Sequence, residues 1–233
     1  MGDDVGVSAA PVPYELPDER VSDAWARPMG EYLVAEGLEP GFAHRIRAEG
    51  PEWFAELGAA TGPISQLLRP DGIRCVAVDL NPPTDAFSPM VCGDLRQLPL
   101  PTARFDAVSA VNCPYFLDDP SVGVREAHRV LRPGGLFLAS APSRYHNPEL
   151  RHVLPDWGER SPFDAEEFAE IVAGSFEDVV VEPWEEPAYY LRDQAAVTDY
   201  LVAFKIPDPG ERATLVETPT YVTKSGVNVW ARR

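Results

Sequence analysis

One short stretch, residues 52–62, constrains the fold of this chain more than any other. Residues 53–57 form an apolar run of strand length that holds a single acid, Glu56, and glycines at positions 58 and 62 let the backbone leave the strand without steric cost. The segment 63–68 begins with proline, which suits the first position of a helix, and its apolar residues recur at helical spacing. The pattern predicts a buried strand, a tight turn and a helix, which is typical of nucleotide-binding loops.

The turn also indicates which ligands it can hold. The start of a helix offers free N–H groups to a carboxylate or a phosphate. Glu56 would repel a pyrophosphate but attract an ammonium group. The spacing Gly58-x-x-x-Gly62 matches neither the dinucleotide fingerprint nor a Walker loop, because no Gly-Lys-Ser/Thr follows. We therefore expect a nucleoside-like ligand with an amino-acid tail.

These residues resemble a motif of a known family. Glu56-x-Gly58-x-x-x-Gly62 at the end of a first strand is similar to the first motif of the class I S-adenosylmethionine-dependent methyltransferases, which usually have a third glycine where this chain has Ala60. The resemblance implies that the cofactor contacts Glu56, Gly58, Ala59, Ala60 and Gly62, and the methyl group of Ala60 could shift the cofactor tail. The alternative for this motif alone is an ordinary strand-to-helix turn.

A second buried strand, residues 73–79, ends in Asp79. In nucleotide-binding α/β folds, a carboxylate at the end of the second strand accepts hydrogen bonds from both ribose hydroxyls. Asp79 follows the turn at the spacing that these folds require, so we predict this role for it and include the adjoining Leu80 in the cofactor site. The alternative is a solvated acid at the end of a strand.

The next connection carries a second resemblance. Residues 81–89 hold three prolines, which leave little room for a crossover helix before a third strand at 90–93. Residues 93–99 (Gly-Asp-x-x-x-Leu-Pro) are similar to the adenine-binding loop of the family. The resemblance implies that Asp94 accepts from the adenine amino group and that the backbone N–H of Leu95 meets a ring nitrogen. The alternative is an Asx-turn formed by Asp94.

A fourth strand at 105–111 is followed by Asn112-Cys113-Pro114-Tyr115. The tetrad resembles the Asn-Pro-Pro-Tyr motif of methyltransferases that modify planar nitrogens, with Cys113 in place of the first proline. We interpret Asn112 and Tyr115 as lining the ligand pocket, and a purely structural turn is the alternative. Residues 129–135 (Arg-Val-Leu-Arg-Pro-Gly-Gly) closely resemble the segment before the fifth strand of the family, so we expect a helix at 121–131, capped by Gly134, and a strand from 136.

The region beyond the fifth strand, residues 142–162, is rich in proline and in polar rings. We interpret it as an irregular insert over the acceptor pocket. Tyr145, His146 and His152 are candidate general bases, because they lie where the acceptor pocket of the family opens. The alternative for either histidine is a surface position. A small, partly aromatic acceptor would bind between residues 145–157 and the aromatic stretch 184–190.

The remaining pattern completes the sheet. Asp164 and Glu167 form a predicted capping box, with Phe163 as a hydrophobic staple, on a helix that ends near Gly174. A sixth strand is expected at 176–183. Segments 221–223 and 227–231, separated by Lys-Ser-Gly, predict a terminal hairpin.

Strands that alternate with helices predict an α/β three-layer sandwich. The resemblance implies a Rossmann-like, seven-stranded, mostly parallel sheet in the order 3-2-1-4-5-7-6, with the last strand antiparallel. We expect one domain over residues 1–233. Residues 1–50 would form an N-terminal arm and cap helices, one starting at Ser22 and one at Pro40.

Charge and composition restrict the partners. The chain has 37 acidic and 20 basic residues and a net charge of −17, which disfavours nucleic acid, because phosphate contacts dominate that affinity. A small molecule is the expected partner. The sequence shows no membrane-length apolar run and no signal peptide pattern, so we expect a cytoplasmic protein. The three cysteines, in or beside predicted strands, are interpreted as reduced, buried thiols.

The resemblance implies methyl transfer from S-adenosylmethionine without a metal. The sulfonium makes methionine a good leaving group, so the protein mainly holds the methyl group in line with the acceptor, and a base is needed only for an acceptor that carries a proton. Two alternatives remain open. A nicotinamide-dependent oxidoreductase agrees with Asp79 but not with Glu56 or the turn spacing. A methyltransferase-like module that binds cofactor or metabolite without catalysis agrees with Ala60.

Overall fold

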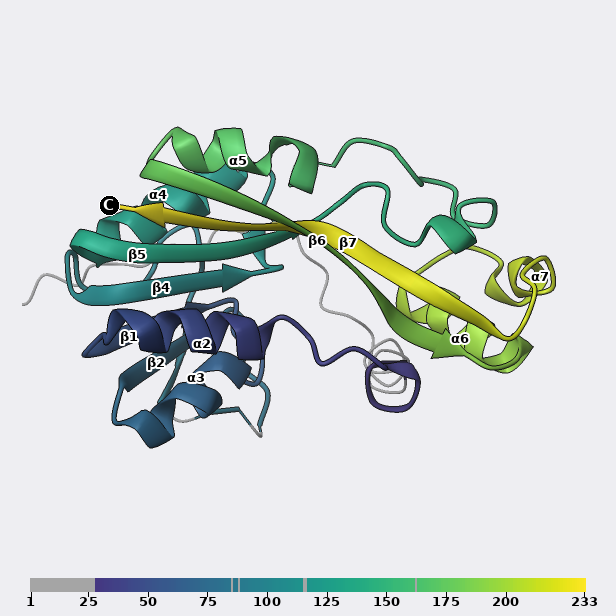
Figure 1. Ribbon diagram of the computed structural model, residues 1–233, viewed down its shortest axis with the longest axis horizontal. Coiled ribbons are helices and arrows are strands. Elements are labelled where there is room, and N and C mark those ends of the chain that lie inside the picture. The colour runs from purple at the N-terminus through teal and green to yellow at the C-terminus, as the bar shows by residue number, and fades with distance from the viewer. Residues whose placement is uncertain (1–27, 85, 88, 115–116, 162) are drawn as a thin grey trace, which may run out of the picture.

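The computed structural model describes residues 28–84, 86–87, 89–114, 117–161 and 163–233. Its centre is a seven-stranded sheet in the order β3-β2-β1-β4-β5-β7-β6 (Figure 1). The strands are β1 Trp53–Leu57, β2 Arg74–Asp79, β3 Met90–Cys92, β4 Phe105–Val111, β5 Leu131–Pro142, β6 Glu177–Leu191 and β7 Thr220–Arg232. Neighbours from β3 to β5 pair in parallel, and β7 runs antiparallel to both β5 and β6. The predicted fold class and strand order are confirmed.

Helices cover both faces of the sheet. They are α2 (Glu39–Glu49) and α3 (Pro63–Leu68, followed by the 3₁₀ turn η2, Arg69–Asp71) on one face, and α4 (Pro120–Val130) and α5 (Ala165–Ala173) on the other (Figure 1). Phe42 of α2 packs with Phe54 and Trp230 in one buried cluster, while Val124 of α4 belongs with Phe137 to another. Because both faces are covered, the central strands are apolar on both sides.

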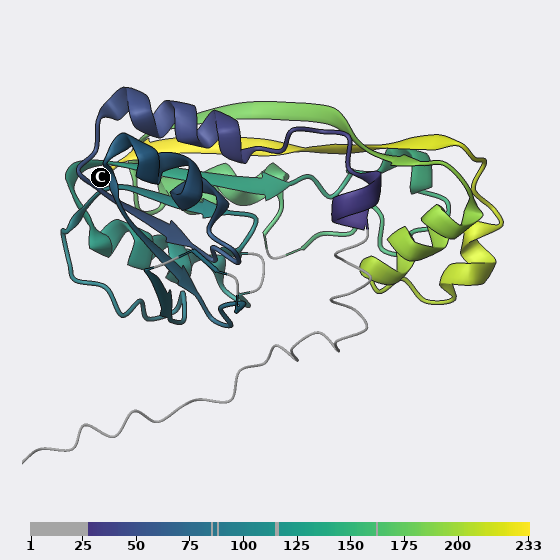
Figure 2. The same ribbon diagram turned by 90° about the horizontal axis from the view of Figure 1, so that it is seen from below.

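The far ends of β6 and β7 carry a second cluster of elements, which we call the distal lobe. It comprises those strand ends and η1 (Pro28–Tyr32), η4 (Pro148–Leu150), α6 (Gln194–Ala203) and α7 (Pro209–Ala213). Figure 2 shows the two strands continuing past the rest of the sheet to reach it. Its own buried cluster includes Tyr32, Tyr189, Tyr200 and Val222. The molecule is therefore elongated, with two strands shared by both ends.

The predicted terminal hairpin is wrong, because β7 is one continuous strand. Gly226 in its middle pairs with Pro142 on β5 and with Trp184 on β6. A Cβ on Gly226 would lie 2.3 Å from the carbonyl oxygen of Ala141 and 2.9 Å from the Trp184 ring. The glycine thus permits close strand packing and not a turn. β6 likewise runs to Leu191, beyond the predicted end at residue 183.

Two helix ends differ from expectation. α4 ends at Val130, and Gly134, with φ of 77°, lies within β5 and does not cap the helix. The helix predicted from Pro40 is confirmed as α2. Most of the helix predicted from Ser22, like the N-terminal arm, lies outside the described residues, and 28–32 form a π-helical turn.

At the start of α5, the predicted hydrophobic staple is confirmed and the predicted capping box is wrong. The rings of Phe163 and Phe168 lie 4.3 Å apart, as the hydrophobic staple requires. The capping box is wrong: the Asp164 carboxylate pairs with the Arg144 guanidinium at 2.8 Å, and Glu167 pairs with Arg144 at 3.3 Å and also with Arg160. A guanidinium binds a carboxylate more strongly than a backbone N–H does, so both acids join this ion cluster.

Candidate functional site

Glu56 stabilises the start of α3 from inside the protein. Its side chain is 4% exposed, and its two carboxylate oxygens accept hydrogen bonds from the N–H groups of Ile64 at 3.0 Å and Ser65 at 2.8 Å. Burial raises the pKa of Glu56, while the hydrogen bonds from Ser65 and Ile64 counteract that rise. The expectation of free N–H groups at this helix start is therefore wrong, because the carboxylate already occupies the positive end of the helix.

The turn between β1 and α3 is left-handed at three positions: φ is 60° at Gly58, 46° at Ala60 and 76° at Gly62. A Cβ on Gly58 would lie 2.2 Å from the Cβ of Cys113, and one on Gly62 would lie 2.6 Å from the Cβ of Phe87. Both glycines are thus required by neighbouring side chains as well as by the backbone. Ala60 is exposed and holds a conformation that costs a non-glycine residue about 1–2 kcal/mol.

Asp79, at the end of β2, lies against this turn. Its carboxylate accepts hydrogen bonds from the N–H of Ala60 at 2.8 Å and from the N–H of Asn81 at 2.9 Å, one to each oxygen. Each oxygen keeps a lone pair that can accept from a hydroxyl group. The structure therefore brings Asp79 together with the turn. Ala59 within the turn is buried, and Leu80, next to Asp79, is 40% exposed.

The segment after β3 forms an Asx-turn, which the sequence analysis gave as the alternative to an adenine-binding loop. The Asp94 carboxylate accepts from the backbone N–H of Arg96 at 2.8 Å, which is an Asx-turn, and pairs with the Arg96 guanidinium at 2.5 Å. Hydrogen bonds from the Arg96 side chain are the main reason that the pKa of Asp94 is lowered. Leu95 packs against the core. A ligand that used Asp94 would have to share it with Arg96.

Asn112 follows β4 at the same edge of the sheet. Its backbone is left-handed, with φ of 48°, and its N–H donates to the carbonyl of Ser140. The side-chain oxygen Oδ1 is buried without a hydrogen-bond partner among the described residues. Cys113 is buried next to it, with Sγ 3.2 Å from the carbonyl oxygen of Leu57, and burial raises the pKa of its thiol. Tyr115 lies outside the described residues.

These residues fit a nucleoside with an amino-acid tail. β1 lies between β2 and β4, so the turn after β1, Asp79 and Asn112 share the carboxyl edge of three adjacent strands, where ligands bind in open α/β sheets. A buried acceptor without a donor costs about 1–3 kcal/mol, and an ammonium group would satisfy the Oδ1 of Asn112. The chemistry of the site therefore suits the predicted cofactor.

The three candidate bases are not brought together. Tyr145 is 50% exposed and packs edge-on against Trp157 at 5.5 Å. His146 is partly buried, and burial together with the charge of Lys224 lowers its pKa to about 3. His152 is exposed in the distal lobe, with Nε2 3.1 Å from the carbonyl oxygen of Leu215. A histidine with the pKa of His146 is neutral at pH 7 and binds a proton weakly.

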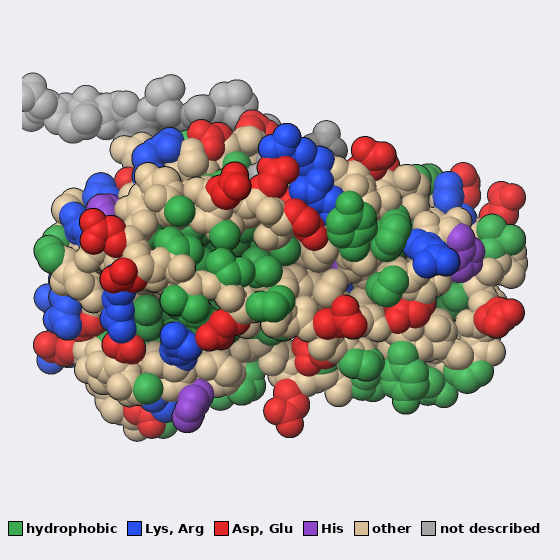
Figure 3. Space-filling view, turned by 45° about the horizontal axis from the view of Figure 1, so that its top comes forward, with side chains coloured by type: hydrophobic (Ala, Val, Ile, Leu, Met, Phe, Trp, Pro, Cys, Tyr) green, Lys and Arg blue, Asp and Glu red, His purple; other side chains and the backbone are tan. Residues whose placement is uncertain are grey.

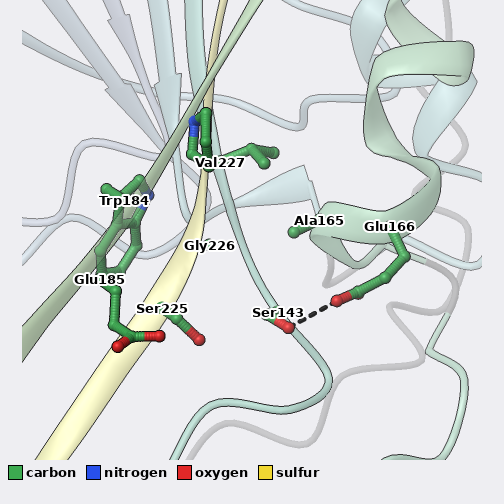
Figure 4. Close-up of a pocket in the computed structure, with 9 residues that line it drawn as sticks. Ser143, Ala165, Glu166, Trp184, Glu185, Ser225, Gly226 and Val227 are labelled. Carbon is green, nitrogen blue, oxygen red and sulfur yellow. Dashed lines mark hydrogen bonds between the residues drawn. The ribbon is translucent and has the colours of Figure 1, made fainter.

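A hollow of about 430 Å³ lies between α5 and the strands β6 and β7 (Figure 4). Its lining is Ser143, Ala165, Glu166, Pro183, Trp184, Glu185, Ser225, Gly226 and Val227. Ser143 donates to Glu166 across it at 2.5 Å, and the indole N–H of Trp184 has no partner among the described residues. The hollow includes Trp184 from the predicted acceptor region but none of residues 145–157.

Lys224 is a residue that the sequence analysis missed. It was assigned to a hairpin turn, but it lies within β7, close enough to His146 to lower the pKa of that ring. The one sequence feature that singles out this residue is the rarity of lysine, because the chain has only two lysines.

The described surface carries mixed charge. Acidic and basic side chains are interspersed on the face in Figure 3. Within the described residues, no three or more His, Cys, Asp or Glu side chains are grouped to hold a metal ion. Of the helices in the described ranges, none has the length and apolar character needed to cross a bilayer.

Comparison with known proteins identifies relatives. Residues 55–139 match a family model described as a methyltransferase domain. The malonyl-(acyl-carrier protein) O-methyltransferase of Serratia marcescens is 30% identical over 133 residues, or 52% of each chain. A fatty-acid O-methyltransferase of Mycolicibacterium smegmatis is 43% identical over 67 residues, which cover 28% of this chain and 24% of the relative. The match thus spans about half of the first relative and less of the second.

A solved structure shares the fold at low identity. An S-adenosylmethionine-dependent methyltransferase from Archaeoglobus fulgidus has a TM-score of 0.56 at 15% identity, covering 91% of this chain and 99% of that one. Its likeness supports the architecture, and the domain match covers the strands and turns that build the site. The domain match over residues 55–139 and the sheet order together support a class I S-adenosylmethionine-dependent methyltransferase.

Proposed function

We propose that the protein transfers a methyl group from S-adenosylmethionine to a small-molecule acceptor. The observation that carries the proposal is the contact of Asp79 with the left-handed turn at 58–62, where Ala60 donates to the carboxylate at 2.8 Å. A partly exposed carboxylate with free lone pairs at this edge suits a ribose diol. The methyltransferase-domain match over residues 55–139 and the names of the relatives support it.

The residues around the turn would hold the cofactor by separate groups. Asp79 would accept from the ribose hydroxyls, and the backbone of the turn at 58–62 would allow the tail to approach closely. Asn112 Oδ1 would accept from the tail ammonium, and Asp94 and Leu95 would meet the adenine. The bound sulfonium supplies an activated methyl group, so the chain has chiefly to position the acceptor in line with it.

An acceptor that is already deprotonated suits this chain best. With a pKa of about 3, His146 takes a proton weakly at neutral pH, and His152 is exposed in the distal lobe. A carboxylate would need no base, because its oxygen could bond directly to the methyl carbon that the cofactor would supply, with the electron pair of the broken carbon–sulfur bond left on sulfur. Two relatives are named for O-methylation of malonyl-(acyl-carrier protein) and of fatty acids. We therefore place carboxylic acids first among the acceptor classes.

Alanine variants of the candidate bases test this acceptor class. With a carboxylate acceptor, His146→Ala and His152→Ala should both keep the turnover of the unchanged protein, since no proton has to be removed. A rate loss of about 10²-fold or more in either variant, with cofactor affinity unchanged, is typical of a lost general base. It would point to an acceptor that carries a proton and would contradict the carboxylate assignment.

We propose that the chain acts as one domain, in which residues 142–162 and the distal lobe cover the acceptor. β6 and β7 run through both the central sheet and the distal lobe. This continuity supports one functional unit over residues 28–233.

Calorimetry tests the proposed cofactor. The protein should bind S-adenosylmethionine or S-adenosylhomocysteine and show no comparable affinity for NAD. Asp79→Ala should weaken binding by about 1.5–3 kcal/mol, the scale for hydrogen bonds to a charged group, whereas Glu170→Ala, an exposed acid on α5, is the matched control and should change nothing.

Three outcomes would overturn the proposal. Unchanged affinity in Asp79→Ala would remove Asp79 from the site. Preferential binding of NAD would favour an oxidoreductase. Tight cofactor binding without methyl transfer to any of a panel of carboxylic acids, alcohols and amines would favour a non-catalytic module.

A further inference from the structure

Lys224 lies just beyond the carboxyl edge of the central sheet. Gly226 on β7 pairs with Pro142, the last residue of β5, and Lys224 precedes Gly226 by two residues. At the rise of an antiparallel strand, two residues place it about 7 Å past the end of β5. It therefore lies on the side where ligands of open α/β sheets bind.

Three aromatic rings surround the ammonium group of Lys224. Its Nζ lies 4.2 Å from the ring centroid of Phe204, 5.4 Å from that of Tyr200 and 5.6 Å from that of Tyr189. Rings at these distances attract a cation through their quadrupoles. They also displace water, and this burial lowers the pKa of Lys224 to about 7. We call the three rings the ring cluster.

The described surroundings of Lys224 hold no anion paired with it. Within the described part of the chain, its Nζ makes no hydrogen bond or ion pair. Glu186 lies opposite Lys224 on β6, but the two side chains form no ion pair among the described contacts. The carboxylate of Glu149 accepts instead from the N–H and Oγ1 of Thr223 at 3.0 and 2.5 Å. The Nδ1 of His146 is buried without a partner among the described residues. An unpaired charge in an apolar setting is costly.

We propose that Lys224 and the ring cluster bind the carboxylate of the methyl acceptor, an acid with an apolar body. The ammonium would pair with the carboxylate, and the rings would contact the apolar part. The inference rests on the proposed function and names the substrate class of the same site. Methylation of that carboxylate would remove its charge, so the ester product would lose the ion pair and leave more readily. Lys224 remains partly exposed, which gives such a ligand access.

Nuclear magnetic resonance of lysine Cε labelled with carbon-13 can test the proposal directly, because only Lys205 and Lys224 give signals. The probes are octanoate and octanamide, which share their apolar body and differ in charge. Octanoate should raise the pKa of Lys224 from about 7 by about 1 or more. A rise of about 1 means that octanoate binds the protein with charged Lys224 about tenfold more tightly than the protein with neutral Lys224. Octanamide should leave it unchanged, and exposed Lys205 should respond to neither.

The titration must be separated from other groups near Lys224. These are Glu186 and Tyr189 on β6, Tyr200 on α6, His146 after β5 and Glu149 on η4. Glu186→Gln should keep the response to octanoate. A fall in the pKa of Lys224 in this variant would show that Glu186 already neutralises it, and an equal response to both probes would show that charge is not recognised. Either result overturns the proposal.

Binding to variants gives an independent measurement. Lys224→Met should weaken octanoate binding at least about tenfold, the scale of a lost charge-assisted hydrogen bond, with octanamide and S-adenosylhomocysteine unaffected. Lys224→Arg should keep part of the affinity, and Lys205→Met is the matched control. Unchanged octanoate affinity in Lys224→Met would overturn the proposal.

The outcomes separate this inference from the proposed function. If S-adenosylhomocysteine binds and Lys224 does not respond to octanoate, the carboxylate site fails alone. If Lys224 responds and no S-adenosylmethionine or S-adenosylhomocysteine binds, the proposed function fails and the acid-binding site stands. The same carboxylate could be presented by a free fatty acid or by a diacid thioester, and comparison of octanoate with malonyl-N-acetylcysteamine distinguishes these two sources.

Discussion

Gly58 and Gly50 have the same φ of 60° but different surroundings. A Cβ on Gly58 would lie 2.2 Å from the Cβ of Cys113, whereas one on Gly50 would meet no atom of the other described residues within 4 Å. The two positions therefore separate backbone strain from side-chain crowding. Crowding at Gly58 matters for the site, because Cys113 follows Asn112 and sets the distance between the turn and the end of β4.

We expect Gly50→Ala to lower the free energy of unfolding by about 1 kcal/mol, the strain of a left-handed alanine. Gly58→Ala should lower it by about 2–4 kcal/mol, since overpacking adds about 1–3 kcal/mol to the same strain. Urea denaturation measures both. Adding Cys113→Gly to Gly58→Ala should recover part of the loss, and a double variant no more stable than Gly58→Ala would contradict crowding as the cause.

His146 makes stability depend on pH in a defined direction. Its pKa is about 3 in the folded protein against an ordinary value of 6.5. Between these values the unfolded chain binds a proton that the folded chain does not, so this residue lowers the free energy of unfolding as pH falls from 6.5 towards 3. His146→Gln should remove that contribution.

Urea denaturation at pH 7 and at pH 4.5 checks this expectation. The variant should lose less stability than the unchanged protein over this interval, and His152→Gln, at an exposed position, should follow the unchanged protein. Equal losses in all three proteins would mean that His146 accepts a proton freely in the folded state.

At the scale of elements, the segment from residue 142 to 162 is the least regular part of the described carboxyl edge. It contains one short 3₁₀ turn, η4, and is held by the ion cluster of Arg144, by Trp157 donating to the carbonyl of His146, and by Tyr200 donating to Asn147 at 3.0 Å. The segment also contacts β7, which carries Lys224. It is therefore anchored at several points along its length.

We predict that this segment still moves when no ligand is bound, since most of its backbone lies outside helices and strands. Amide hydrogen exchange should show increased protection of residues 142–162 when S-adenosylhomocysteine and a carboxylic acid are both present. β4, buried along its length, serves as the internal reference. The N-terminal arm, which lies outside the described residues, is predicted to behave in the same way. Equal protection with and without ligands would indicate fixed structure.

At the scale of the whole molecule, patterns carried within single segments predicted most of the strands and helices, and the resemblance to the methyltransferase family supplied the order of the strands in the sheet. Contacts between distant segments were not visible. The approach of Cys113 to Gly58 and the pairing of Glu56 with α3 depend on packing. The residues Lys-Ser-Gly before Val227 have turn propensity, but pairing with strands on both sides overrides it. Lys224 was missed for that reason.

The continuity of β7 also limits which chain segments could be exchanged between this protein and its relatives by recombination. Trp230 packs in the core beside α2, and Lys224 lies on the same strand among the rings of the distal lobe. Because side chains alternate along a strand, one inserted or deleted residue between them would turn one of the two to the opposite face. Recombination that alters the acceptor would therefore have to transfer β6 and β7 as a complete pair, whereas the nucleotide half could be exchanged separately.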